Sequence, residues 1–126
     1  MLFRSDRGGA RGLGLHLIPT EELLTRGVDD VLPEVRDRLG TGPVFLSFDI
    51  DSVDPGFAPG TGTPEVGGPS SRDALRLVRG LTGIEFVGFD LVEVMPQYDS
   101  GEVTSLLAGT LVHEFLALLA LRRRDG

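Results

Sequence analysis

Three aspartates, Asp49, Asp51 and Asp54, stand where an apolar stretch of the sequence gives way to a loop rich in glycine and proline. Asp49 and Asp51 are two positions apart, so both side chains point the same way on an extended strand. Two carboxylates this close repel each other unless a cation neutralises them, and oxygen ligands suit magnesium, manganese or calcium. The spacing therefore predicts a divalent cation at Asp49 and Asp51. Asp54, which precedes Pro55 and Gly56, is equally compatible with a plain turn.

Secondary structure must position these carboxylates, and the sequence predicts alternating strands and helices. We expect strands over residues 13–18, 44–50 and 84–94, and helices over residues 20–26, 29–39, 70–81 and 100–121. Ser70 and Asp73 have the spacing of a capping box, and Asp99 or Ser100 can cap the last helix. The alternation is typical of an α/β fold, a parallel sheet with helices on both faces. Ligands of such sheets collect beyond the carboxyl ends of the strands, here residues 49–54 and 93–95.

Composition excludes several classes of protein. The 126 residues include no cysteine, which excludes a disulfide framework, a thiolate zinc site and a cysteine nucleophile, and they include only two histidines, His16 and His113. The formal charge of -7 is opposite to that of a non-specific nucleic-acid binder. The longest apolar stretch, residues 106–121, reads as too short and too polar to span a bilayer. With no secretory signal visible, we expect a cytoplasmic protein without nucleic-acid or membrane partners.

The loop after the aspartates carries a more specific pattern. Residues 47–55 read Ser-Phe-Asp-Ile-Asp-Ser-Val-Asp-Pro, and residues 58–68 read Ala-Pro-Gly-Thr-Gly-Thr-Pro-Glu-Val-Gly-Gly. Together they closely resemble the C-terminal signature of the ureohydrolase family, which includes arginases and agmatinases. Residues 88–96, Gly-Phe-Asp-Leu-Val-Glu-Val-Met-Pro, are similar to the substrate-side strand of that family. The resemblance covers the chain from about residue 14 onward.

Within the family, two positions are more similar to the agmatinase branch than to the arginases. They are Glu65, which follows Thr63-Pro64, and Gly60, which precedes Thr61. Guanidinobutyrases and related amidinohydrolases share much of this pattern. Agmatine is therefore the first substrate to expect, and guanidinobutyrate the next.

The resemblance implies the C-terminal half of the arginase-like fold, a three-layer α/β/α arrangement with a parallel sheet. It also implies manganese-dependent hydrolysis of a guanidino compound to urea and an amine, with two manganese ions that generate the nucleophile from water. Carried over residue by residue, the family pattern assigns metal binding to Asp49 and Asp51 and substrate binding to Glu93 and Thr63. It assigns supporting roles to Asp54 and to Asp90, and Asp90 is expected to be buried. The simpler alternatives are a salt bridge from Glu93 to Arg72 or Arg76, and a plain loop hydroxyl at Thr63.

One departure from the family pattern limits this reading. The family requires Gly-Gly-Asp-His and Asp-x-His-x-Asp segments upstream, and neither occurs in these 126 residues. We therefore expect residues 11–126 to be the C-terminal portion of a single ureohydrolase domain, after a non-native or disordered start at residues 1–10. The isolated chain should be inactive, and the full-length form a homo-oligomer. The alternative is a non-catalytic half-domain, truncated or degenerate, that associates with itself or with another subunit.

Overall fold

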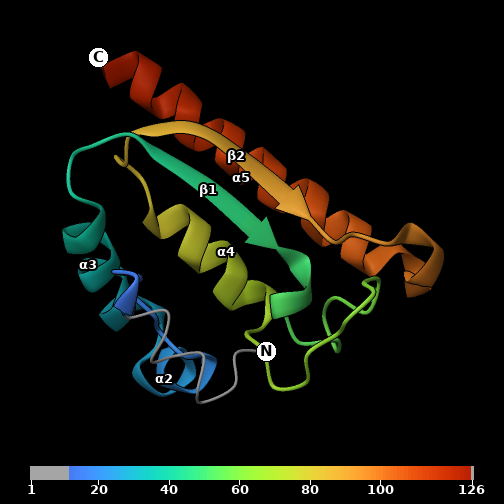
Figure 1. Cartoon of the computed structure of the whole chain (residues 1–126). Coiled ribbons are helices and arrows are strands. Elements are labelled where there is room, and N and C mark those ends of the chain that lie inside the picture. The colour runs from blue at the N-terminus through green and yellow to red at the C-terminus, as the bar shows by residue number, and fades with distance from the viewer. Residues whose placement is uncertain (1–11, 126) are drawn as a thin grey trace.

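The computed structural model describes residues 12–125, which form two parallel strands and several helices (Figure 1). The elements in chain order are α2 (Thr20–Arg26), α3 (Val28–Leu39), β1 (Val44–Asp49), α4 (Ser71–Gly80), β2 (Phe86–Val92) and α5 (Val103–Asp125), with short 3-10 turns at Ile50–Ser52, Pro96–Tyr98 and Ser100–Glu102. The predicted α/β class with a parallel sheet is confirmed. The start expected at residues 1–10 lies outside the described residues.

The two strands are neighbours in the sheet, and α4 connects them. Their register places Ser47 opposite Asp90 and Asp49 opposite Val92. Because the strands run in parallel, their carboxyl ends lie at the same edge of the sheet. The chain therefore brings Asp49 and the residues that follow Val92 to one place.

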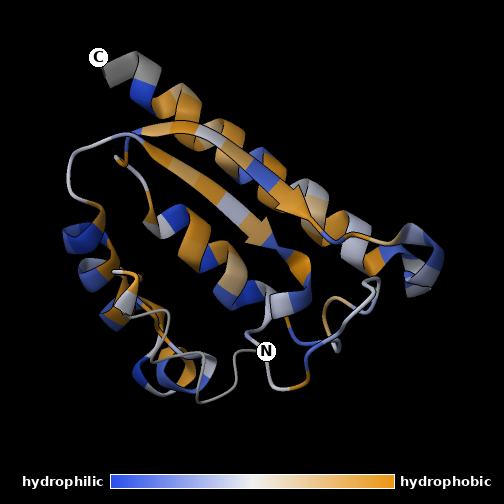
Figure 2. Cartoon of the chain, viewed as in Figure 1, coloured by the Kyte–Doolittle hydropathy of each residue, from blue (hydrophilic) through white to orange (hydrophobic). Residues whose placement is uncertain are grey.

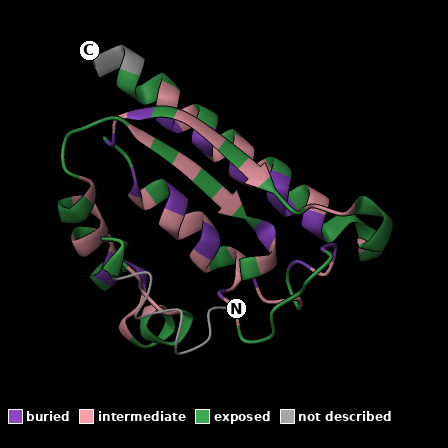
Figure 3. Ribbon diagram, viewed as in Figure 1, coloured by how far each residue is buried: buried purple, intermediate pink, exposed green. Residues whose placement is uncertain are grey.

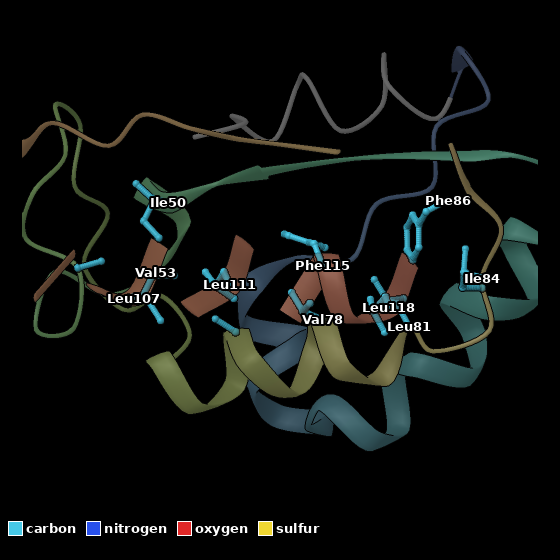
Figure 4. Packing of buried hydrophobic residues seen from close by; sticks show 12 residues of the cluster. Ile50, Val53, Val78, Leu81, Ile84, Phe86, Leu107, Leu111, Phe115 and Leu118 are labelled. Carbon is cyan, nitrogen blue, oxygen red and sulfur yellow. The ribbon is translucent and has the colours of Figure 1, made fainter. Parts of the chain in front are cut away.

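The hydrophobic core lies between the sheet and the helices α4 and α5 (Figure 4). Val78 of α4 and Leu111 and Phe115 of α5 are buried there. The ring of Phe115 stacks on Phe89 of β2, with ring centroids 4.7 Å apart. This contact fixes α5 against the sheet, and α5 thereby supports the strand ends.

Only one face of the sheet is covered in this way. Residues of β1 alternate between half-buried and exposed, which is the period of a strand packed on one side (Figure 3). The exposed side chains of β1, beginning with Phe45, point away from α4 and α5. Residues 12–125 thus supply the sheet and one helical layer of the three layers expected.

Side chains cap two helices as predicted. The Ser70 hydroxyl accepts a hydrogen bond from the Asp73 N–H at 3.1 Å, and the Asp73 carboxylate accepts one from the Ser70 N–H at 3.3 Å. The Asp99 carboxylate accepts bonds from the N–H groups of Thr104 at 2.9 Å and Ser105 at 2.7 Å. Burial raises the pKa of Asp99, but the hydrogen bonds from Ser105 and Thr104 outweigh it and lower this pKa to about 2.

The strand predicted over residues 13–18 is wrong, because this segment has no regular secondary structure. Leu13 is 82% exposed, and the Arg38 guanidinium donates to the Gly14 carbonyl at 2.7 Å. A strand needs a neighbouring strand to pair its backbone groups. Within residues 12–125, β1 and β2 pair only with each other, so the segment has no sheet to join.

Helix α5 is 23 residues long and, by length and composition alone, apolar enough to cross a membrane. The reading of this stretch as too short and too polar was therefore wrong. Its inner face nevertheless lies in the core through Leu111 and Phe115, and its Glu114 pairs with Arg79 of α4 at 2.6 Å. These contacts are those of a helix packed in a globular domain. The absence of a membrane partner stays a prediction.

Candidate metal and substrate site

The two aspartates expected to bind metal lie next to each other where β1 gives way to a turn. Asp49 ends β1, and Asp51 lies in the 3-10 turn that follows it. The Asp49 carboxylate accepts the Asp51 N–H at 3.2 Å, and the Ser52 hydroxyl donates to the Asp49 carbonyl at 2.7 Å. These local bonds hold both carboxylates at the carboxyl end of the strand.

A third carboxylate, Glu93, directly follows Val92, the residue that lies opposite Asp49 in the register. Burial raises the pKa of Asp49, the backbone hydrogen bond from Asp51 lowers it, and the negative charges of Asp51 and Glu93 raise it further. A net rise means that the charged form of Asp49 is disfavoured without a cation nearby. Hard oxygen donors of this kind fit manganese or magnesium.

The set of donors is incomplete within this chain. Among residues 12–125, no group of three or more histidine, cysteine or acidic side chains is arranged to hold a metal ion. His16 bonds to Glu34 at 2.6 Å, far along the chain from the aspartates, and His113 is exposed on α5. Asp49 and Asp51 therefore fit a metal ion as two donors out of a larger set.

Thr63 is hydrogen-bonded to one of the two predicted metal ligands. Its hydroxyl donates to the Asp51 carboxylate at 2.8 Å. The bond spans twelve positions of the loop and orients one oxygen of Asp51. Thr63 is therefore more than a plain loop hydroxyl, although a contact with substrate stays a prediction.

Asp54 bonds to two separate parts of the loop. Its two carboxylate oxygens accept the N–H groups of Gly56 and Gly67, each at 2.8 Å. The bond from Gly56 and then that from Gly67 lower the pKa of Asp54. Gly68 lies close by, because a Cβ there would sit 2.3 Å from the Ser52 carbonyl oxygen. The turn that carries Asp51 therefore packs closely against the backbone of Gly68.

Glu93 follows β2 in a strained backbone conformation. Its φ is +66°, in the left-handed region that residues other than glycine rarely adopt. Such strain costs about 1–3 kcal/mol and persists where the surroundings fix a side chain for function. The alternative partner Arg76 pairs with Asp29 instead. The described contacts thus give no support to a salt bridge at Glu93.

Asp90 is not buried as expected. It lies opposite Ser47 in the register and is exposed on the face of the sheet that α4 and α5 do not cover. Burial of Asp90 would require a further layer on that face. Its supporting role remains a prediction.

Thr104, which is fully buried, was not predicted as a functional residue. Its hydroxyl accepts the Gly60 N–H at 2.7 Å, and the Gly60 carbonyl accepts the Met95 N–H at 2.8 Å. Thr104 thus joins the start of α5 to the loop that holds Thr63 and to the segment after β2. A hydroxyl on the inner face of an apolar helix is the one sequence feature that could have indicated it.

A cavity of about 710 Å³ opens beside Asp51 and Thr63. Its other walls come from the start of α2 and from residues 65–68. Glu21 and Glu65 add two carboxylates, and no lysine or arginine lines the cavity. This negative lining favours a cationic occupant.

Comparison with known proteins supports the reading of the motifs. A family model described as Arginase family matches residues 3–118. A guanidinopropionase of Pseudomonas aeruginosa is 50% identical over 115 residues, which are 91% of this chain and 36% of that protein. An agmatinase of Enterobacter sp. is 47% identical over 112 residues, which are 89% of this chain and 37% of that protein.

The structure agrees with those of longer proteins. A hypothetical agmatinase from Burkholderia thailandensis superposes with a TM-score of 0.87 at 41% identity, over 90% of this chain and 36% of that one. An arginase from Bacillus subtilis gives a TM-score of 0.83 at 32% identity, over 90% of this chain and 41% of that one. The chain thus spans little more than a third of the curated relatives it matches.

Proposed function

Because the chain belongs to the arginase family, we propose that it carries part of the active site of a ureohydrolase. The reaction is hydrolysis of a guanidino compound, agmatine or a close analogue, to urea and an amine. One observation carries the proposal: Asp49, Asp51 and Glu93 lie at the adjoining ends of two parallel strands, close enough for their charges to act on one another. Thr63 is bonded to this group through Asp51.

Asp49 and Asp51 are the residues that would hold manganese. Burial chiefly raises the pKa of Asp49, and the negative charge of Asp51 adds to the rise. A divalent cation would offset both effects by stabilising the two charged carboxylates. When bound, manganese supplies a nucleophile near neutral pH by lowering the pKa of water. Asp54 and the Thr63 hydroxyl keep the Asp51 turn in place through their hydrogen bonds.

Glu93 is the residue that would bind the guanidinium group. A carboxylate accepts two parallel N–H bonds from a guanidinium, which fixes both its position and its orientation. The strained backbone of Glu93 supports this assignment, because strain of this kind accumulates at binding sites. The Thr63 hydroxyl would contact the same group, and the carboxylates of Glu21 and Glu65 favour a substrate with a second positive charge, as in agmatine.

The isolated chain should not catalyse this reaction. Two aspartates leave most coordination positions of two metal ions to water, so neither ion is held firmly. We expect the purified chain with added manganese to release no urea from agmatine. Rapid urea release together with tight, stoichiometric manganese binding would contradict this expectation.

A chimera tests the proposed function directly. The region of the Enterobacter sp. agmatinase that matches this chain is replaced by residues of this chain, and urea release from agmatine is measured. We expect an active chimera in which Glu93→Gln lowers the rate by about 10²–10³-fold, the range for losing one charge-stabilising group. Asp37→Asn, on the exposed side of α3, is the matched control and should leave the rate unchanged. An inactive but folded chimera, or equal activity of both variants, would reject the proposal.

A further inference from the structure

The loop that follows β1 is attached to the rest of the chain at two levels. At its base, the Asp54 carboxylate accepts backbone N–H groups from two separate parts of the loop. At its tip, the Gly60 N–H donates to the Thr104 hydroxyl at 2.7 Å, and the Gly60 carbonyl accepts the Met95 N–H at 2.8 Å. The start of α5 and the segment after β2 therefore hold the tip, beyond the carboxyl ends of both strands (Figure 1).

Close packing reinforces the two bonds at the tip. A Cβ at Gly60 would lie 2.6 Å from the Cβ of Asp99 and 2.9 Å from its Cα, so the backbone of Gly60 lies directly against Asp99. A Cβ at Gly62 would lie 2.8 Å from the Met95 sulfur, so the Met95 side chain lies over the next part of the loop. The tip of the loop and residues 95–99 thus form one packed unit.

Thr104 is itself held in place by Asp99. The Asp99 carboxylate accepts the Thr104 N–H at 2.9 Å, the Ser105 N–H at 2.7 Å and the Ser105 hydroxyl at 2.8 Å. Thr104 is fully buried, and Gly60 is buried as well. A buried backbone N–H needs a partner inside the protein, and the Thr104 hydroxyl is the partner of Gly60.

The tip lies between the two halves of the proposed site. Three positions beyond Gly60, the Thr63 hydroxyl donates to the Asp51 carboxylate at 2.8 Å. Two positions before Met95 stands Glu93, whose backbone is strained at a φ of +66°. Within a few residues, the chain therefore leads from the tip to a proposed metal ligand on one side and to the proposed guanidinium ligand on the other.

We propose that Thr104 is a positioning residue whose hydroxyl, acting through Gly60, holds Glu93 at a fixed distance from the metal-binding aspartates. This inference rests on the proposed function and deepens it, because it names a residue outside the site that sets the geometry of the site. Glu93 orients a guanidinium group, and a misplacement of about 1 Å can cost about 10²-fold in rate. In this role Thr104 acts only through the backbone that it holds.

Hydrogen exchange of the whole chain, followed by NMR, tests the link itself. Thr104→Val keeps the branched shape of the side chain but removes the acceptor, so the Gly60 amide should exchange at least about fivefold faster, the equivalent of one lost hydrogen bond. The Met95 amide should follow, because its acceptor is the Gly60 carbonyl. The Ala74 amide, which donates to the Ser70 carbonyl in α4, should change far less. An equal rise at all three amides would overturn the inference.

Kinetics of the chimera with the Enterobacter sp. agmatinase test the effect on the site. At saturating manganese, Thr104→Val should lower kcat for agmatine by about 10- to 100-fold, and more manganese should not restore it. Thr104→Ser keeps the hydroxyl and should retain most of the activity. Thr110→Val is the matched control, because the Thr110 hydroxyl donates to the Leu106 carbonyl within α5. This change should leave kcat and KM unaltered.

Thr104→Ala covers the possibility that Thr104→Val unfolds, as judged by circular dichroism. It leaves room for a water molecule at the Gly60 N–H, but a water does not fix the loop, so kcat should still fall. A lower Tm with unchanged kcat and KM, a Thr104→Ser variant as impaired as Thr104→Val, or an equal effect of Thr110→Val would each overturn the inference. An inactive unchanged chimera rejects the proposed function and this inference with it, whereas an active chimera that is insensitive to changes at Thr104 rejects this inference alone.

Discussion

Gly68 has no room for a side chain, and a methyl group there should destabilise the site loop. A Cβ at this position would lie 2.3 Å from the Ser52 carbonyl oxygen and 2.7 Å from the Asp54 nitrogen. Ordinary contacts begin near 3.4 Å, so these backbone atoms must retreat by roughly 1 Å. Overpacking of this kind costs about 1–3 kcal/mol. In a domain of this size that loss lowers Tm by roughly 3–15 °C.

The displacement should also loosen the bonds that hold the Asp51 turn. The Asp54 N–H donates to the Pro69 carbonyl at 3.1 Å, and the Gly67 N–H donates to the Asp54 carboxylate at 2.8 Å. Both bonds join the two sides of the loop that Gly68→Ala forces apart. Faster hydrogen exchange at the Asp54 and Gly67 amides should therefore accompany the lower Tm.

Thermal unfolding followed by circular dichroism at pH 7 measures the effect. Gly109→Ala is the matched control, because Gly109 is exposed within α5 and has nothing within 4 Å of an added Cβ. Alanine is the better helix former, so this change should raise stability by up to about 1 kcal/mol. If Gly68→Ala unfolds at the wild-type temperature, the close approach of Gly68 to Ser52 does not exist in solution.

Three further predictions concern packing, acid stability and backbone strain. Phe115→Ala should lower the free energy of unfolding by about 3–5 kcal/mol, because the ring of Phe115 is buried against Phe89. In the same urea unfolding experiment, Leu116→Ala, at an exposed position, should stay within about 0.5 kcal/mol of wild type. Burial raises the pKa of Asp99, but the hydrogen bonds at the start of α5 outweigh burial and lower this pKa to about 2. In the unfolded chain the pKa of an aspartate is about 3.9. The contribution of Asp99 to stability is therefore complete above about pH 4 and is lost as the pH falls toward 2. Melting curves between pH 5 and pH 2 should therefore fall more steeply for wild type than for Asp99→Asn, and parallel curves would contradict the assignment. Glu93→Gly should be more stable than Glu93→Ala by roughly 1 kcal/mol because glycine adopts the positive φ of this position without strain, and the reverse order would show that the strain is absent.

Features that depend on neighbours along the chain were predicted well from the sequence. The capping box of Ser70 and Asp73 spans three positions, and the bonds from Asp99 to the start of α5 span five and six. Backbone N–H groups at a helix start need acceptors wherever the helix lies, so such patterns predict structure locally. The loop motif assigned metal binding to Asp51 and substrate binding to Thr63, but it did not predict the hydrogen bond that the Thr63 hydroxyl donates to the Asp51 carboxylate.

Features that depend on distant parts of the fold were not predictable in this way. The bond between Thr104 and Gly60 joins residues 44 positions apart. Nothing near either residue indicates the other, because the approach depends on how α5 packs against the sheet. The exposure of Asp90 depends on whether a layer covers its face of the sheet. Residue type alone does not determine that layer.

The wrong strand prediction has a related cause. Strand propensity mostly measures how a side chain packs on a neighbouring strand and on a covering layer. β1 reads as almost continuously hydrophobic (Figure 2), which is typical of a parallel strand buried on both faces. In this structure Phe45 of β1 is 60% exposed and Leu13 is 82% exposed. Both segments are thus more apolar than their exposure within residues 12–125 would lead one to expect, and their strand-like composition depends on packing that these residues do not provide.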